Sequence, residues 1–199
     1  MLAICPEDPR SLASASRMAR RLRGMKQVHA AQLLGVTQST VSRIECGELK
    51  PAGTLRDRLL DLVSARLHPA RDAALRRLVE GSANSLHLVC DLTHRLLAAS
   101  APREREWRRT AVELRGRSLW QYASEAILAA EQRLPSLGWG EREGAHSTTF
   151  VTGSNSSREL HIVPGVLVWE RILLSDGSPA RLVTSTTDRR RGLEYATSA

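Results

Sequence analysis

The stretch between residues 27 and 47 constrains this chain most, because it predicts two short helices joined by a tight turn. Residues 27–36 have helical spacing of apolar positions and reach Gly35, a residue suited to the left-handed conformation that ends a helix. Thr37 follows as a typical N-cap for a second helix over 38–45, and Gly47 closes it. Two short helices with this connection predict a helix-turn-helix motif.

The residues inside this motif have the sizes that its packing requires. A small residue is needed where the helices cross, a glycine in the turn, and apolar residues that hold the second helix against a core. The chain supplies them in order as Ala31, Gly35, Val36, Val41 and Ile44. Apolar spacing also predicts a first helix over 11–23 and a closing helix from Leu55 to Leu67, before Pro69.

Positive charge is concentrated in this first part of the chain. The 199 residues contain 29 Lys and Arg against 21 Asp and Glu, a formal net charge of +8. Between Pro9 and Ile44 there are seven basic residues and no acidic one. A solvated helix face normally mixes both signs, so this stretch favours a surface that faces phosphates.

Residues 16–63 resemble the lambda-repressor-like family of helix-turn-helix proteins, also called Cro/C1 or XRE. The likeness rests on the run from Gln27 through Ala31, the segment 34–45 and Gly47. Lys26 departs from the pattern, because the family usually has a capping Ser or Thr there. The resemblance implies an all-α bundle and a bacterial-type transcription regulator that binds inverted-repeat operators in double-stranded DNA as a homodimer.

In that family the second motif helix lies in the major groove, and its exposed residues read base edges. Val41 and Ile44 must point inward, which leaves the remaining polar residues of the helix to face DNA. The residues expected to contact bases are Gln38, Ser39, Thr40, Ser42 and Arg43. Those expected to contact phosphates are Gln27, Thr37, Arg17, Arg20, Arg21 and Lys26.

From residue 86 the sequence changes to short apolar or alternating runs separated by turns. The strands expected are 86–90, 95–99, 147–152, 159–174 with a break near Pro164, and 181–185, and residues 103–134 are expected to be helical. Residues 84–188 resemble a PAS domain, which implies an α+β fold: an antiparallel five-stranded sheet with helices on one side. Such a domain senses a small molecule, holds a partner or dimerises.

The chain therefore divides into two expected domains with a connection between them. Residues 1–68 form the DNA-binding domain, 69–83 a connecting helix and linker, 84–188 the PAS-like domain, and 189–199 a tail whose arginines are expected to be solvated. The helix expected at 72–80 either packs on its own chain or contributes to a dimer.

Catalytic motifs are missing from the sequence, so we expect no enzyme. The only lysines, Lys26 and Lys50, lie in the DNA-binding part, which excludes a self-cleaving Ser/Lys peptidase in the second half. No metal or cofactor is predicted, although haem or another small ligand in the PAS-like domain stays open. The candidate ligands, for which ordinary structural roles are favoured, are His87, His94, His146, His161 and Cys90.

The apolar runs are too short for a membrane span, and the first residues do not resemble a secretory signal. Three widely spaced cysteines suit a reducing compartment, so a cytoplasmic location is expected. Two alternatives to a plain DNA-binding regulator stay open. One is an antitoxin-like or adaptor protein whose C-terminal domain binds another protein, and the other is a small-molecule sensor that gates DNA binding.

Overall fold

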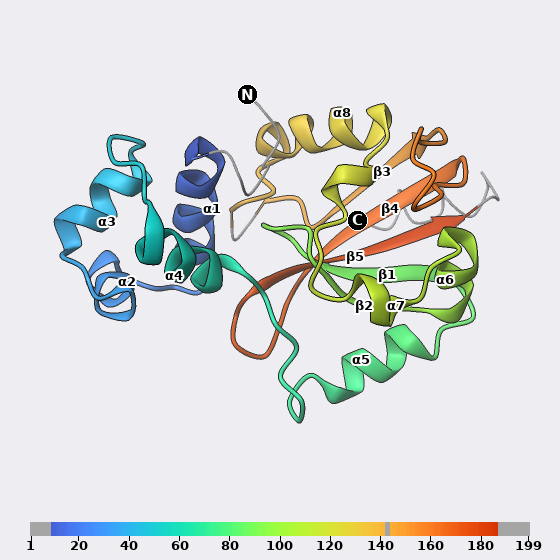
Figure 1. The fold of residues 1–199 in the computed structure, drawn as a ribbon, viewed down its shortest axis with the longest axis horizontal. Helices are drawn as coiled ribbons and strands as arrows, with labels where there is room; N and C mark the ends of the chain where they lie inside the picture. The colour runs from blue at the N-terminus through green and yellow to red at the C-terminus, as the bar shows by residue number, and fades with distance from the viewer. Residues whose placement is uncertain (1–8, 142–143, 187–199) are drawn as a thin grey trace.

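A computed structural model describes residues 9–141 and 144–186, and it begins with a bundle of α-helices (Figure 1). These helices are α1 (Pro9–Leu22), α2 (Gln27–Leu34), α3 (Gln38–Glu45) and α4 (Gly53–Val63). Their buried faces meet in one core to which Leu12, Leu34, Val41, Ile44 and Leu59 contribute. The predicted all-α N-terminal domain is confirmed, and α2 and α3 have the bounds that the motif predicted.

The closing helix is shorter than predicted, because α4 ends at Val63 and not near Leu67. Ser64 already has an extended backbone, and the main-chain N–H of Ala65 donates to the Sγ of Cys90 at 3.2 Å. Cys90 belongs to the second domain, so a contact remote in sequence draws the chain out of the helix. Local apolar spacing alone could not show this.

The second half contains a five-stranded antiparallel sheet with the order β2-β1-β5-β4-β3. The strands are β1 (Ser85–Cys90), β2 (Leu96–Ala99), β3 (Ser147–Thr152), β4 (Gly165–Leu173) and β5 (Pro179–Thr186). Between β2 and β3 lie α6 (Ala101–Trp107), α7 (Ala111–Leu114), η1 (Trp120–Tyr122), α8 (Glu125–Arg133) and η2 (Leu134–Leu137). This is the α+β arrangement that the PAS resemblance implied.

One predicted strand is wrong in its first half. Residues 159–164 are not in a strand, and β4 begins only at Gly165. The side chain of Asn155 donates to the carbonyl of Leu160 at 2.9 Å and accepts from the N–H of Ile162 at 3.0 Å. These side-chain bonds occupy backbone groups that a strand would give to its neighbour, and Pro164 has no N–H to offer.

The two faces of the sheet pack against different parts of the chain. The inner face carries Val89 and Trp169 and packs under the helices of the 101–137 segment. The outer face carries Leu88, Cys90 and Ala180 and belongs to the same apolar cluster as the N-terminal bundle. Val79 of α5 (Ala73–Glu80) also joins this cluster. The N-terminal helical bundle therefore shares a continuous core with the outer face of the sheet.

Polar contacts hold the turn between β4 and β5 to the N-terminal half. Arg23 donates to the carbonyl of Leu62 at 2.6 Å and to the Oγ of Ser178 at 2.5 Å. Asp72 accepts from the N–H and the hydroxyl of Ser175 at 3.0 and 3.1 Å. The turn between β4 and β5 is thus held both to the residue after α1 and to the connecting segment. Among the described residues, no helix is long and apolar enough to cross a membrane.

Candidate nucleic-acid interface

The helix α3 is anchored so that one side faces the core and the other faces solvent. Its N-cap residue, Thr37, accepts a hydrogen bond from the N–H of Thr40 at 3.2 Å. Val41 and Ile44 are both about 1% exposed, which fixes the rotation of the helix. Three of the five residues predicted to contact bases are exposed, and the other two are half-buried. The exposed ones are Gln38, Ser39 and Arg43, and the half-buried ones are Thr40 and Ser42.

A hydrogen bond joins the first residues of the two motif helices. The side-chain amide of Gln38 donates to the Oε1 of Gln27 at 2.7 Å. The Nε2 of Gln27 in turn donates to a carboxylate oxygen of Glu45 at 3.0 Å. Gln38 is therefore held in place by a chain of hydrogen bonds that begins at the far end of its own helix.

An ion pair between α1 and the end of α3 completes this network. The guanidinium of Arg20 donates twice to the carboxylate of Glu45, at 2.7 and 3.0 Å. Arg17 donates to the main-chain oxygen of the same glutamate. Burial alone would raise the pKa of Glu45, but the hydrogen bonds from Arg20 and Gln27 outweigh it, and the pKa is lowered. Glu45 is consequently an ionised anchor for α1, α2 and α3.

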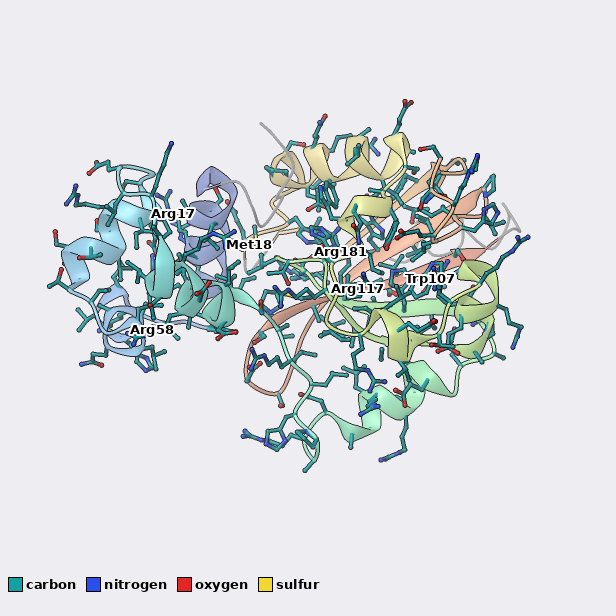
Figure 2. The ribbon with its side chains drawn as sticks, in the orientation of Figure 1. Arg17, Met18, Arg58, Trp107, Arg117 and Arg181 are labelled. Atoms are coloured by element: carbon teal, nitrogen blue, oxygen red, sulfur yellow. The ribbon has the colours of Figure 1, made fainter. Side chains whose placement is uncertain are left out.

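This network involves residues that the sequence had placed at phosphates. Arg20 is tied to Glu45 inside the bundle, whereas Arg21, Lys26 and Arg43 are exposed. Arg17 is exposed as well, although one of its nitrogens is used by the contact with Glu45. Figure 2 labels Arg17 on α1, on the side of the bundle that carries α3. The basic residues thus form two groups. Arg17 and Arg20 bind Glu45 and hold the helices of the motif together, whereas Arg21, Lys26 and Arg43 are exposed and available to an anion.

The ends of α2 are stabilised differently. Lys26 stands at the N-cap with an extended backbone and makes no side-chain capping bond, as its departure from the family pattern suggested. At the other end Gly35 has a φ of 65°, and Arg58 of α4 donates to the carbonyl of Leu34 at 3.3 Å. Sequence reasoning missed Arg58 and Glu45. For Glu45 the available signal was its place as the first acidic residue after the acid-free stretch from Pro9 to Ile44.

The histidines considered as haem or metal ligands do not converge with the cysteine. Cys90 lies on the outer face of the sheet, whereas His87 and His94 line a cavity on the inner face. His146 contacts the guanidinium of Arg171 at 2.8 Å, and His161 is exposed. Within the described parts of the chain, no group of three His, Cys, Asp or Glu side chains is placed to hold a metal ion.

Comparison with known proteins agrees with the geometry of the N-terminal bundle. Residues 17–55 match a family model described as helix-turn-helix. The match covers α2 and α3 entirely and α1 from Arg17 to its end, the segments that carry the network around Glu45. The N-terminal part of the chain is therefore an XRE-type helix-turn-helix domain, of the kind found in DNA-binding regulators. A search of curated proteins finds no match.

Three solved structures, among others, are similar to parts of the chain. A PAS domain of an HTR-like protein from Haloarcula marismortui is 17% identical, with a TM-score of 0.42 over 58% of this chain and 89% of that one. The E. coli DhaR(N)–DhaL complex is 18% identical, with a TM-score of 0.41 over 74% of this chain and 43% of that one. An RNA-binding light-oxygen-voltage receptor is 13% identical, with a TM-score of 0.42 over 94% and 63%.

These TM-scores are low, so the description of the second domain rests on its own strand order and layers. The sheet is antiparallel, its five strands follow the order β2-β1-β5-β4-β3, and its inner face is covered by the helices between β2 and β3. The chain thus combines a helix-turn-helix domain with an α+β domain whose antiparallel sheet and covering helices have the arrangement that the PAS resemblance implied.

Proposed function

We propose that this protein is a sequence-specific transcription regulator that binds inverted-repeat operators as a homodimer, with α3 in the major groove. The exposed face of α3 carries this proposal, because Gln38 is oriented there by Gln27 before any DNA arrives. A glutamine held in this way pairs with adenine through two hydrogen bonds at little further entropic cost. Arg43, one to two turns further along the same helix, pairs with guanine or a phosphate.

The other predicted DNA contacts keep their places in the proposal. Ser39, Thr40 and Ser42 read base edges or thymine methyl groups, while Thr37, Arg21 and Lys26 contact phosphates. Gln27, Arg17 and Arg20 were also assigned to phosphates. Their hydrogen bonds within the bundle support an additional role in holding α3, which Arg20 performs through Glu45.

The homodimer requires a contact surface outside the recognition helix. Leu78 of α5 and Val112 of α7 are 74% and 79% exposed, and the two helices are joined by an ion pair between Arg115 and Glu80 at 3.3 Å. We propose these two exposed apolar side chains as contact points for a second copy. Two-fold symmetric regulators of this kind place their recognition helices about one turn of DNA apart, ~34 Å.

The cytoplasm is the location that this function requires, since the target is chromosomal DNA.

The alternative of an antitoxin-like or adaptor protein predicts a stable protein partner in stoichiometric amount. A pull-down that recovers only the chain itself would argue against it. The alternative of a ligand sensor is favoured by the cavity in the PAS-like domain.

Genome-wide mapping of bound DNA by crosslinking and sequencing tests the proposal. The wild-type protein is compared with the double variant Gln38→Ala/Arg43→Ala and with a matched control, Gln32→Ala/Arg71→Ala, at exposed positions outside α3. We expect sharp peaks that share an inverted repeat for the wild type and the control, and loss of these peaks in the Gln38/Arg43 variant. Peaks that survive in that variant would refute the assignment of α3.

A further inference from the structure

Two loops of the second domain lie against α1 and hold the N-terminal bundle to the sheet. The first loop follows η2, where a Cβ added to Gly140 would lie 2.6 Å from the Cε of Met18. The backbone at Gly140 is therefore in direct contact with α1, and Figure 2 labels Met18 between α1 and the second domain. The neighbouring Trp139 is buried and donates to a carboxylate oxygen of Asp91 at 2.9 Å, which anchors this loop in the second domain.

The second loop is the turn between β4 and β5. The guanidinium of Arg23, just after α1, donates to the carbonyl of Leu62 on α4 at 2.6 Å and to the Oγ of Ser178 at 2.5 Å. Ser178 is buried, and its hydroxyl donates to the carboxylate of Asp176 at 2.8 Å, which fixes its orientation. One arginine side chain thus joins two helices of the bundle to the turn.

The chain that connects the bundle to the second domain is also bonded on its way. Near its start, the N–H of Ala65 donates to the Sγ of Cys90 on β1 at 3.2 Å. Near its end, the buried carboxylate of Asp72 accepts from the N–H of His68 at 2.7 Å and from the N–H and hydroxyl of Ser175 at 3.0 and 3.1 Å. A flexible linker would let the two domains move independently, whereas these bonds and the shared apolar core hold them together.

This docked arrangement leaves α3 open to DNA. Figure 1 shows α3 on the side of the bundle away from the sheet, and Gln38, Ser39 and Arg43 are exposed on it. In a homodimer, the distance between the two α3 helices is set by the bundle, by its junction with the sheet and by the contact between the copies. Moving one half-site by one base pair displaces it by ~3.4 Å and turns it by about 35° around the DNA axis. A junction that holds the bundle in one orientation cannot follow such a displacement.

We propose that the junction between the bundle and the sheet determines which half-site spacing the protein accepts. Arg23 and Asp72 are positioning residues in this proposal, because they touch no DNA and fix the orientation of α3 relative to the second domain. The inference rests on the proposed function, a homodimer on an inverted repeat with its contact at Leu78 and Val112, and adds to it the selection of spacing.

Cys46, at the C-cap of α3, gives a direct measure of the distance between the two recognition helices. It is exposed whereas Cys90 is buried, so in a Cys5→Ser background a spin label attaches at Cys46. Double electron–electron resonance on the DNA-free homodimer measures the distribution of distances between the two labels. We expect one narrow distribution for the otherwise unchanged protein and a clearly broader one for Arg23→Gln/Asp72→Asn.

Mobility shifts measure the spacing preference on the preferred operator, resynthesised with its half-sites moved by one or two base pairs in either direction. Engaging two linked sites together raises affinity by about 10²–10⁴, and the gain is lost where the geometry forbids it. We expect the wild type to bind its own spacing at least about tenfold more tightly than the neighbouring ones, and Arg23→Gln/Asp72→Asn to discriminate less than about threefold. The preference for the correct bases within each half-site should not change. A merely structural role for the two residues would lower the affinity for all spacings alike.

The matched control is Arg66→Gln/Asp61→Asn, which makes the same two changes in an exposed ion pair at the end of α4 and just beyond it. It should keep the wild-type distance distribution and spacing preference. Ser178→Ala removes only the hydroxyl that Arg23 binds, and should broaden the distribution to a smaller degree. This milder variant carries the comparison if the double variant fails to fold.

The outcomes separate this inference from the function on which it rests. A broad distance distribution in the wild type, or equal affinity for all spacings, would overturn the inference and leave the homodimer on an inverted repeat intact. A distribution and a spacing preference that stay unchanged in Arg23→Gln/Asp72→Asn and in Ser178→Ala would overturn the role of the junction. Absence of any distance between labels, or of any inverted repeat among the bound sites, would refute the proposed function and the inference with it.

Discussion

The side chains of Gln27 and Gln38, the first residues of two successive helices, are joined by a hydrogen bond of 2.7 Å. Gln27 also donates to Glu45, which Arg20 holds from α1. Three residues, Gln27, Glu45 and Arg20, therefore determine where the amide of Gln38 points, and they come from three different helices. This arrangement predicts that recognition depends on residues that do not touch bases themselves.

The substitution Gln27→Ala should weaken binding to the preferred operator by about tenfold, because Gln38 loses the partner that orients its amide. Binding to unrelated duplexes should change less. Electrophoretic mobility shifts with both kinds of DNA measure the difference. The control Gln32→Ala removes an exposed glutamine from the same helix and should leave both affinities unchanged.

The substitution Glu45→Gln should destabilise the N-terminal bundle. The Glu45 side chain is 2% exposed and the Arg20 side chain 17%, so the change leaves a largely buried guanidinium without its counter-ion. Loss of one partner from a buried pair commonly costs ~3 kcal/mol. Urea unfolding measures this free energy. Glu48→Gln, at an exposed position just beyond α3, is the matched control and should cost almost nothing.

Stability should fall in acid through the buried network of the second domain. Burial alone would raise the pKa of Glu131, but Arg181 outweighs it and holds this pKa well below the ordinary value of 4.5. A carboxylate with a lowered pKa contributes stability above its ordinary pKa, and this contribution is lost as the pH falls towards the lowered value. We expect the free energy of unfolding to decline below about pH 4.5.

The variant Glu131→Gln tests the source of this decline. It removes the titrating group, so the protein should be less stable at neutral pH and its stability should depend less steeply on pH in the acid range. Thermal unfolding from pH 7 to pH 3 measures both. An acid slope identical to that of the wild type would assign the decline to other carboxylates, for example Asp72, whose pKa is also lowered.

Binding to DNA should weaken steeply as salt is added. If several exposed basic residues contact phosphates, raising the salt concentration from about 50 to 200 mM lowers the affinity by orders of magnitude. Lys26→Gln removes one such residue and should reduce the slope of log affinity against log salt by about one. A slope near zero for the wild type would contradict the assignment of the basic residues to phosphates.

The sequence predicted the elements whose signals are local. The motif helices α2 and α3 follow from Gly35, Thr37 and the apolar spacing between them, and both have the expected bounds. The predictions of β1 and β2, and of the order of strands and helices along the second domain, were also correct. These features depend on residues that are close together in the chain, so a single sequence is enough to predict them.

The features that escaped prediction depend on contacts between distant residues. Arg20 could be assigned to phosphate because nothing near it in the sequence shows that Glu45 lies beside it. The early end of α4 follows from a contact with Cys90, and the loop at 159–164 is held by Asn155. His87 and His94 line one cavity only because the sheet and the helices enclose it together.

The most direct test of α3 as the recognition helix is the ratio of affinities for the preferred operator and an unrelated duplex of equal length. In Gln38→Ala/Arg43→Ala this ratio should fall towards one, while binding to the unrelated duplex stays near the wild-type value. Circular dichroism confirms that the variant is folded. A ratio equal to that of the wild type would contradict the account, because specificity would then arise elsewhere in the chain.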